Sequence, residues 1–133
     1  MLYRKIASKI ESFLKSEKKR MLVVSGARQV GKSYIIREVG MRLYSNFIEV
    51  NMEEDKQSNR LFENARTVED FMFALSTIAG AKMKDSEKTL VFIDEIQAYS
   101  HLLTLAKFLV EDGRFTYIAS GSQLGIALKT TQS

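Results

Sequence analysis

The sequence contains one complete match to the pattern G-x-x-x-x-G-K-S/T, the segment Gly26-Ala27-Arg28-Gln29-Val30-Gly31-Lys32-Ser33. A short apolar run, residues 21–25, precedes it, and a helical pattern begins at Tyr34. The glycines allow the backbone to curl so that successive N–H groups face inward, and the helix adds its positive N-terminal end. Together they form a cradle for phosphate groups. The chain is therefore constrained to a strand, loop and helix in which the strand is buried in a parallel sheet.

The residues of this segment have different expected tasks. Lys32 is expected to reach the β- and γ-phosphates, and the hydroxyl of Ser33 is expected to coordinate Mg²⁺. We expect the whole segment and the adjoining Tyr34 to contact the nucleotide, whereas the individual role of Arg28 stays open. The alternative is that the two glycines only end a strand and begin a helix, but this leaves the Lys–Ser pair unexplained.

The rest of the sequence alternates between strand and helix patterns. Strand patterns cover residues 21–25, 46–51, 89–93 and 115–119. Helical periodicity covers an amphipathic N-terminal segment at about 2–15 and residues 34–44, 68–78, 99–110 and 124–128. In the third of these helices we expect Thr67 as the N-cap and Phe71, Leu75 and Ile78 on one side. This order predicts a single α/β domain, residues 1–133, with helices on both faces of a mostly parallel sheet.

Two adjacent carboxylates follow the apolar run at 90–93. Asp94 and Glu95 are thereby delivered to the carboxyl end of a strand, the edge at which open α/β sheets bind ligands. Asp94 is expected to hold Mg²⁺, and Glu95 to activate the attacking water as a general base. An acidic pair is also an ordinary way to end a strand, and only the upstream phosphate-binding segment favours the functional interpretation.

Two serines follow the last predicted strand. Because strand 46–51 comes between the first and third strands along the chain, we expect strand 115–119 to be inserted between those two in space. Ser120 and Ser122 then lie near the gap between the phosphate-binding segment and Asp94, where a hydroxyl could sense the γ-phosphate or orient water. The alternative is that both hydroxyls bond to the backbone of a turn.

The chain resembles the AAA-type ATPases, and more narrowly a prokaryotic group of ATP-binding proteins whose complete members carry a C-terminal nuclease-like region. The resemblance rests on the phosphate-binding segment and on two further motifs, Phe92-Ile93-Asp94-Glu95-Ile96-Gln97 and Ser120-Gly121-Ser122-Gln123-Leu124-Gly125. It covers essentially the whole chain. The first motif is shared by many nucleotide hydrolases, whereas the three together are fairly specific.

The resemblance implies a P-loop NTPase-like sheet with strand order 1-4-3-2 and ATP rather than GTP as the ligand. It also implies a sensor role for Ser120 or Ser122. A further implication is that Asn51 acts as a switch that holds Glu95 away from water until a partner engages. Asn51 could equally be a cap at the end of its strand.

The sequence departs from the resemblance after the fourth strand. We expect a form truncated before the fifth strand and the helical lid, which binds nucleotide but hydrolyses it weakly or not at all. Arg114 does not match the position of an arginine finger, a group worth about 10³ to 10⁵ in rate. Without a fifth strand, we expect the first strand to lie at a sheet edge and to expose Leu22, Val23 and Val24 to self-association into a homo-oligomer.

Composition sets the remaining limits. The chain of 133 residues has a net charge of +4, which favours anionic partners without identifying one. It has no cysteine, and it lacks both a secretory signal and an apolar run of membrane-spanning length. We therefore expect a cytoplasmic protein without a membrane partner. The alternative function is a nucleotide-regulated module, with vestigial hydrolysis, that recruits DNA or a protein partner, for example through a C-terminal region.

Overall fold

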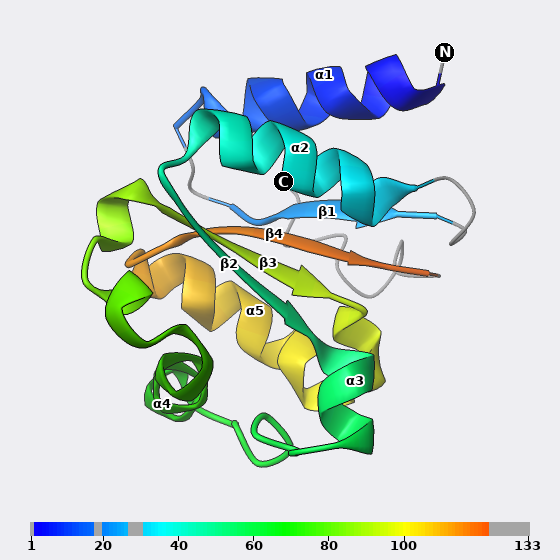
Figure 1. Ribbon diagram of the computed structural model, residues 1–133. Helices are drawn as coiled ribbons and strands as arrows, with labels where there is room; N and C mark the ends of the chain where they lie inside the picture. Colours follow the sequence, from blue (N-terminus) through cyan, green and yellow to red (C-terminus); the bar gives the residue numbers. More distant parts are fainter. Residues whose placement is uncertain (1, 18–19, 27–30, 123–133) are drawn as a thin grey trace.

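The computed structural model describes residues 2–17, 20–26 and 31–122, which form a four-stranded parallel sheet in the order β1-β4-β3-β2 (Figure 1). The strands are β1 Leu22–Ser25, β2 Asn46–Asn51, β3 Thr89–Asp94 and β4 Thr116–Gly121. This confirms the predicted α/β class and strand order, including the insertion of the fourth strand between the first and the third. The predicted helix at 124–128 lies outside the described residues.

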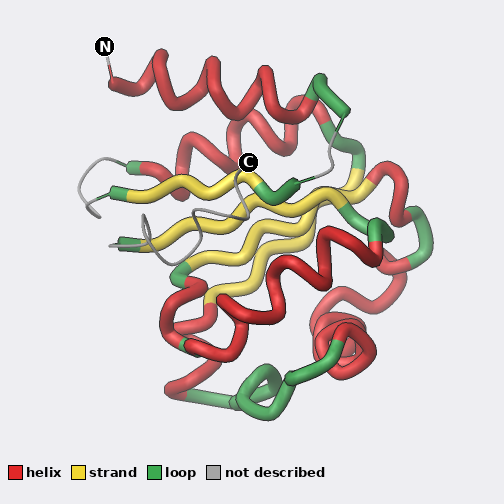
Figure 2. Tube along the Cα trace, turned by 180° about the vertical axis from the view of Figure 1, so that it is seen from behind, coloured by secondary structure: helices red, strands yellow, loops and turns green. Residues whose placement is uncertain are grey.

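Helices cover both faces of the sheet. On one face lie α1 Leu2–Leu14 and α2 Lys32–Leu43, and on the other α4 Val68–Ala79 and α5 Ser100–Asp112, with α3 Met52–Gln57 after β2 (Figures 1 and 2). Three short 3₁₀ helices complete the described elements: η2 Gly80–Met83, η3 Ser86–Lys88 and η4 Ile96–Ala98. None of the helices in the described ranges is long and apolar enough to cross a membrane.

Two hydrophobic cores lie on opposite faces of the sheet. Along β3, Leu90 and Phe92 belong to the core under α1 and α2, whereas Val91 and Ile93 belong to the core under α4 and α5. This division follows from the pleat, which directs successive side chains to opposite faces. All residues of β3 are buried. The uninterrupted apolar run in the sequence therefore reflects a strand that is covered on both sides.

The sequence patterns assign neither a helix nor a strand to residues 52–66, but the structure has a helix there. Residues 52–57 form the short helix α3, although their sequence is polar and has no clear period. Asp55 fixes the segment that follows, because its buried carboxylate accepts hydrogen bonds from the backbone of Leu61 and Phe62 and from the hydroxyl of Tyr99. Thr67 caps α4, as predicted, and Phe71 and Leu75 are buried, whereas Ile78 is half exposed.

The expected exposure of the first strand is wrong for its side chains. Leu22, Val23 and Val24 are only 8%, 8% and 9% exposed, because they alternate into the two cores. Within the described residues β1 is nevertheless an edge strand. A hollow of about 180 Å³ lies beside it and is lined by β1 and by α1 residues that include Ile6 and Ile10. The sheet edge is therefore flanked by α1.

Close packing of α2 on the sheet generates the first prediction. A Cβ atom at Gly40 would lie 2.7 Å from Cδ2 of Leu90 and 2.8 Å from Cε1 of Phe47, both of which are buried. Overpacking of this kind costs about 1–3 kcal/mol, against a gain in helix propensity of about 1 kcal/mol. Gly40→Ala should therefore lower the free energy of unfolding by about 1 kcal/mol. Met41→Ala, at the exposed neighbouring position, should leave it almost unchanged in the same urea titration.

The buried phenol of Tyr117 generates a second prediction, which concerns the pH dependence of stability. Its hydroxyl has no hydrogen-bond partner among the described residues, and burial raises the pKa of Tyr117 above its ordinary value of 10.0. Tyr117 therefore ionises first in the unfolded chain, so its contribution to stability should be constant below about pH 10 and fall as the pH rises further. Tyr117→Phe should be as stable as the wild type or more stable at neutral pH, and should lose less stability at about pH 11. An equal loss in both proteins would contradict the prediction.

Candidate nucleotide-binding site

The carboxyl ends of the four strands meet at one edge of the sheet. Asn51 at the end of β2 pairs in register with Asp94 at the end of β3. On β4, Ser120 follows Ala119, the last residue in register with β3, and Gly121 lies in register with Ser25 of β1. Three residues that the sequence singled out, Asn51, Asp94 and Ser120, are thus brought together from three different strands, beside the end of β1. This is the edge at which ligands bind in open α/β sheets.

The beginning of α2 lies against this edge. Gly31 precedes the helix with φ 69° and ψ 30°, a left-handed conformation that a glycine adopts without steric cost. Lys32 is the first helical residue and is only 3% exposed, whereas Tyr34 is largely exposed. Gly26 also has a positive φ, and its N–H donates to the carbonyl oxygen of Gly121 over 3.3 Å. The four loop residues predicted to bind nucleotide lie outside the described residues: Ala27, Arg28, Gln29 and Val30.

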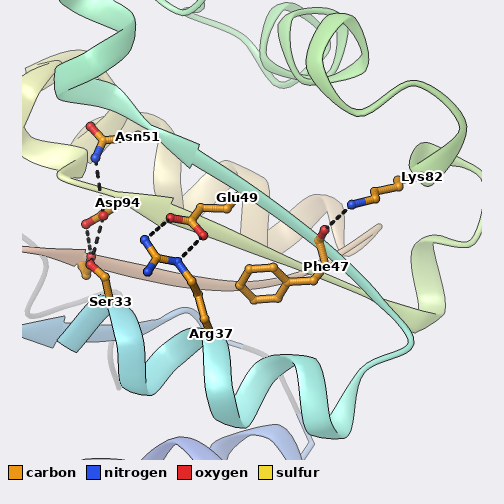
Figure 3. Close-up of polar contacts among 8 residues, drawn as sticks. Ser33, Arg37, Phe47, Glu49, Asn51, Lys82 and Asp94 are labelled. Carbon is orange, nitrogen blue, oxygen red and sulfur yellow. Dashed lines mark hydrogen bonds and ion pairs between the residues drawn. The ribbon is translucent and has the colours of Figure 1, made fainter. Parts of the chain in front are cut away.

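Asp94 is the centre of the polar cluster (Figure 3). The Ser33 hydroxyl donates to its Oδ2 over 3.0 Å, and the side-chain amide of Asn51 contacts the same oxygen at 3.5 Å. The Ser120 hydroxyl donates to Oδ1 over 2.6 Å. Asp94 is only 5% exposed. A buried carboxylate requires such donors, because removing a charge from water without compensation is costly.

Glu95 occupies an unusual backbone conformation. Its φ of 51° and ψ of 48° are left-handed, which for a residue with a side chain costs about 1–2 kcal/mol. The residue is 7% exposed, and its Oε1 accepts a hydrogen bond from Nε2 of Gln97 over 2.8 Å. The left-handed residue ends the strand and begins η4, so the direction of this carboxylate is set by a turn.

The other predicted site residues have contacts that bear on their roles. Asn51 caps α3, because its Oδ1 accepts a hydrogen bond from the backbone N–H of Glu54 over 3.0 Å. Its side-chain amide also contacts Asp94, so Asn51 is not only a helix cap. Ser120 is completely buried, and its hydroxyl contacts Asp94. Ser122, one residue beyond β4, is partly exposed.

Sequence reasoning missed an ion pair beside the cluster. Arg37, one helical turn after Ser33, donates to both carboxylate oxygens of Glu49 on β2 over 2.7 and 2.8 Å (Figure 3). Hydrogen bonding to Glu49 raises the pKa of Arg37, and the charge of Asp94 adds to this effect. The pair fixes α2 to the strand beside Asp94. No local pattern signals it, because the two residues belong to elements whose contact is known only from the fold.

The fold and the arrangement at the sheet edge define a P-loop type of α/β nucleotide-binding unit. The family model described as an AAA domain matches residues 18–133, and the chain belongs to this family. It is therefore a P-loop ATPase-type module, as the sequence motifs predicted. A search of curated proteins finds no match to the chain.

The fold is also similar to a solved structure. The structure of C. elegans PCH-2 superposes with a TM-score of 0.58 at 17% sequence identity and covers 98% of this chain. The aligned region is 39% of the PCH-2 chain, so the present chain spans well under half of that protein. At this level of identity the similarity concerns the fold alone.

The contact between Ser120 and Asp94 generates a prediction about stability. Ser120→Ala should lower the free energy of unfolding by about 1–3 kcal/mol, because it removes a donor from a buried carboxylate oxygen. Ser122→Ala is the matched control at a partly exposed position and should change stability by less than about 0.5 kcal/mol. Urea unfolding of both variants without nucleotide measures the difference. Equal stabilities would show that the hydroxyl of Ser120 does not support Asp94.

Proposed function

We propose that this AAA domain binds ATP together with Mg²⁺ and hydrolyses it weakly. The observation that supports the proposal most directly is the contact between Ser33, at the start of α2, and Asp94, at the end of β3. It unites two motifs that are 61 residues apart in the sequence. Lys32 and the amides of residues 26–33 would hold the phosphates, which the positive end of α2 also favours. Tyr34 would lie at the border of this nucleotide site.

The donor set fits Mg²⁺. The ion prefers oxygen ligands at about 2.0–2.1 Å in octahedral geometry, which places two adjacent ligands about 2.9 Å apart. The oxygens of Ser33 and Asp94 are 3.0 Å apart, close to this separation. Ser33 and Asp94 would therefore be the protein's groups at the metal. When bound, the ion neutralises charge on the phosphate oxygens.

Hydrolysis requires a base beside the cluster, and we assign this role to Glu95. Its carboxylate would take a proton from water while the water oxygen forms a bond to the γ-phosphorus and the bond to the ADP oxygen breaks. Ser122 would act as the sensor of the γ-phosphate. Ser120 would instead hold Asp94 in position, and Asn51 would couple the site to α3 as a switch.

The second candidate is the nucleotide-regulated module without effective hydrolysis. In this function the ATP site controls binding of DNA or a protein, through a C-terminal nuclease-like region, or assembly with further copies in the cytoplasm. Exposed Arg4, Lys5 and Lys9, grouped on α1, provide a surface for an anionic partner. Both functions need nucleotide binding, and they differ in whether binding leads to turnover.

Binding of ATP tests what the two functions share. Lys32→Ala should weaken binding of ATP with Mg²⁺ about 10- to 150-fold, the equivalent of about 1.5–3 kcal/mol for a charge-assisted contact. Lys107→Ala, an exposed position on α5, is the matched control and should bind like the wild type. Isothermal titration measures both affinities. If the Lys32 variant and the wild type bind ATP equally well, the proposed site is wrong.

Turnover then separates the two candidates. In the same preparations, Glu95→Gln should retain ATP affinity and reduce phosphate release at least about 100-fold, the usual contribution of a general base. A wild-type protein that binds ATP without releasing phosphate would favour the regulatory module.

A further inference from the structure

The side-chain amide of Gln97 is hydrogen-bonded to the carboxylate of Glu95. The 3₁₀ helix η4 folds the chain back after β3, and the N–H of Ala98 donates to the carbonyl oxygen of Glu95 over 3.0 Å. This turn brings the side chains of Glu95 and Gln97 together, with Nε2 of the amide 2.8 Å from Oε1 of the carboxylate. Gln97 belongs to a motif that the sequence singled out, but no task in nucleotide binding or hydrolysis was assigned to it.

The orientation of the Gln97 amide is informative. Its Oε1 is buried and has no hydrogen-bond partner among the described residues. A carboxylate only accepts hydrogen bonds, so the NH₂ group must face Glu95 and the amide oxygen must point elsewhere. An unsatisfied buried acceptor is unfavourable and is tolerated only where another contact outweighs it. The bond to Glu95 is the contact that fixes this side chain.

We propose that Gln97 is a positioning residue that holds the Glu95 carboxylate in the orientation in which it activates water. This inference rests on the proposed function of Glu95 as the general base. One carboxylate oxygen is held by the amide, so the carboxylate cannot rotate about its last torsion without breaking that bond. Such restraint matters for catalysis, because a displacement of about 1 Å can cost about 100-fold in rate.

Steady-state hydrolysis of ATP by the full chain tests the role in catalysis. Gln97→Met keeps the length of the side chain but removes the donor, and should lower kcat about 10- to 100-fold while KM changes less than about twofold. In a Glu95→Gln background the same substitution should cause no further loss, because the base that it positions is absent. A merely structural role would instead lower ATP affinity or add its effect in both backgrounds.

A second measurement does not depend on turnover. Hydrogen exchange of side-chain amides, followed by NMR, should be about tenfold slower for Gln97 than for the exposed Gln57, because exchange requires the bond to Glu95 to open. Glu95→Ala should remove this protection. Gln57 thus serves as the control, because it is the same residue type in the same protein.

The outcomes separate this inference from the proposed function. Rapid exchange of the Gln97 amide, an unchanged or higher kcat in Gln97→Met, or ATP binding without turnover in the wild type would each overturn the role of Gln97. Failure of the wild type to bind ATP would instead overturn the proposed function, and the exchange experiment would still report whether Gln97 holds Glu95.

Discussion

The structure depends on how the carboxylate of Asp94 is accommodated at the end of a fully buried strand. Three donors from three elements meet it: Ser33 of α2, Asn51 of β2 and Ser120 of β4. Burial of an ionised group is unfavourable unless it is hydrogen-bonded, so these contacts are a condition for placing a charge there. The contact of Ser33 with Asp94 also holds the start of α2 against the carboxyl edge of the sheet, and this brings the first two sequence motifs together.

The strand order provides the framework for this arrangement. Because β4 is inserted between β1 and β3, the phosphate-binding segment and Asp94 are separated by one strand, and Ser120 lies between them. The two cores hold the strands in this register through side chains such as Phe92 on one face and Ile93 on the other. A shift of one residue would exchange these faces and would move Asp94 away from Ser33.

The fold could be predicted from the sequence because its signals are local. Strands such as β3 are continuous apolar runs, and the cap of α4 is a single threonine at the expected position. The helix α3 could not be predicted, because side-chain contacts of Asp55 with the backbone of the following loop and with the distant Tyr99 stabilise its surroundings. In the site, the residue types and motifs pointed to Asp94 and Ser33. The contacts of Ser120 and Gln97 depend on side-chain orientation, which no sequence pattern specifies.

The two hydrogen bonds of Asn51 have a mechanical consequence. Its side chain joins Asp94 to the first turn of α3, and Asp55 of the same helix is bonded to Tyr99, which directly follows η4. A closed ring of contacts therefore runs from one acidic residue of β3 through α3 and back to the turn that carries the other. These contacts connect α3, through Asn51 and Tyr99, to the two consecutive acidic residues at the end of β3.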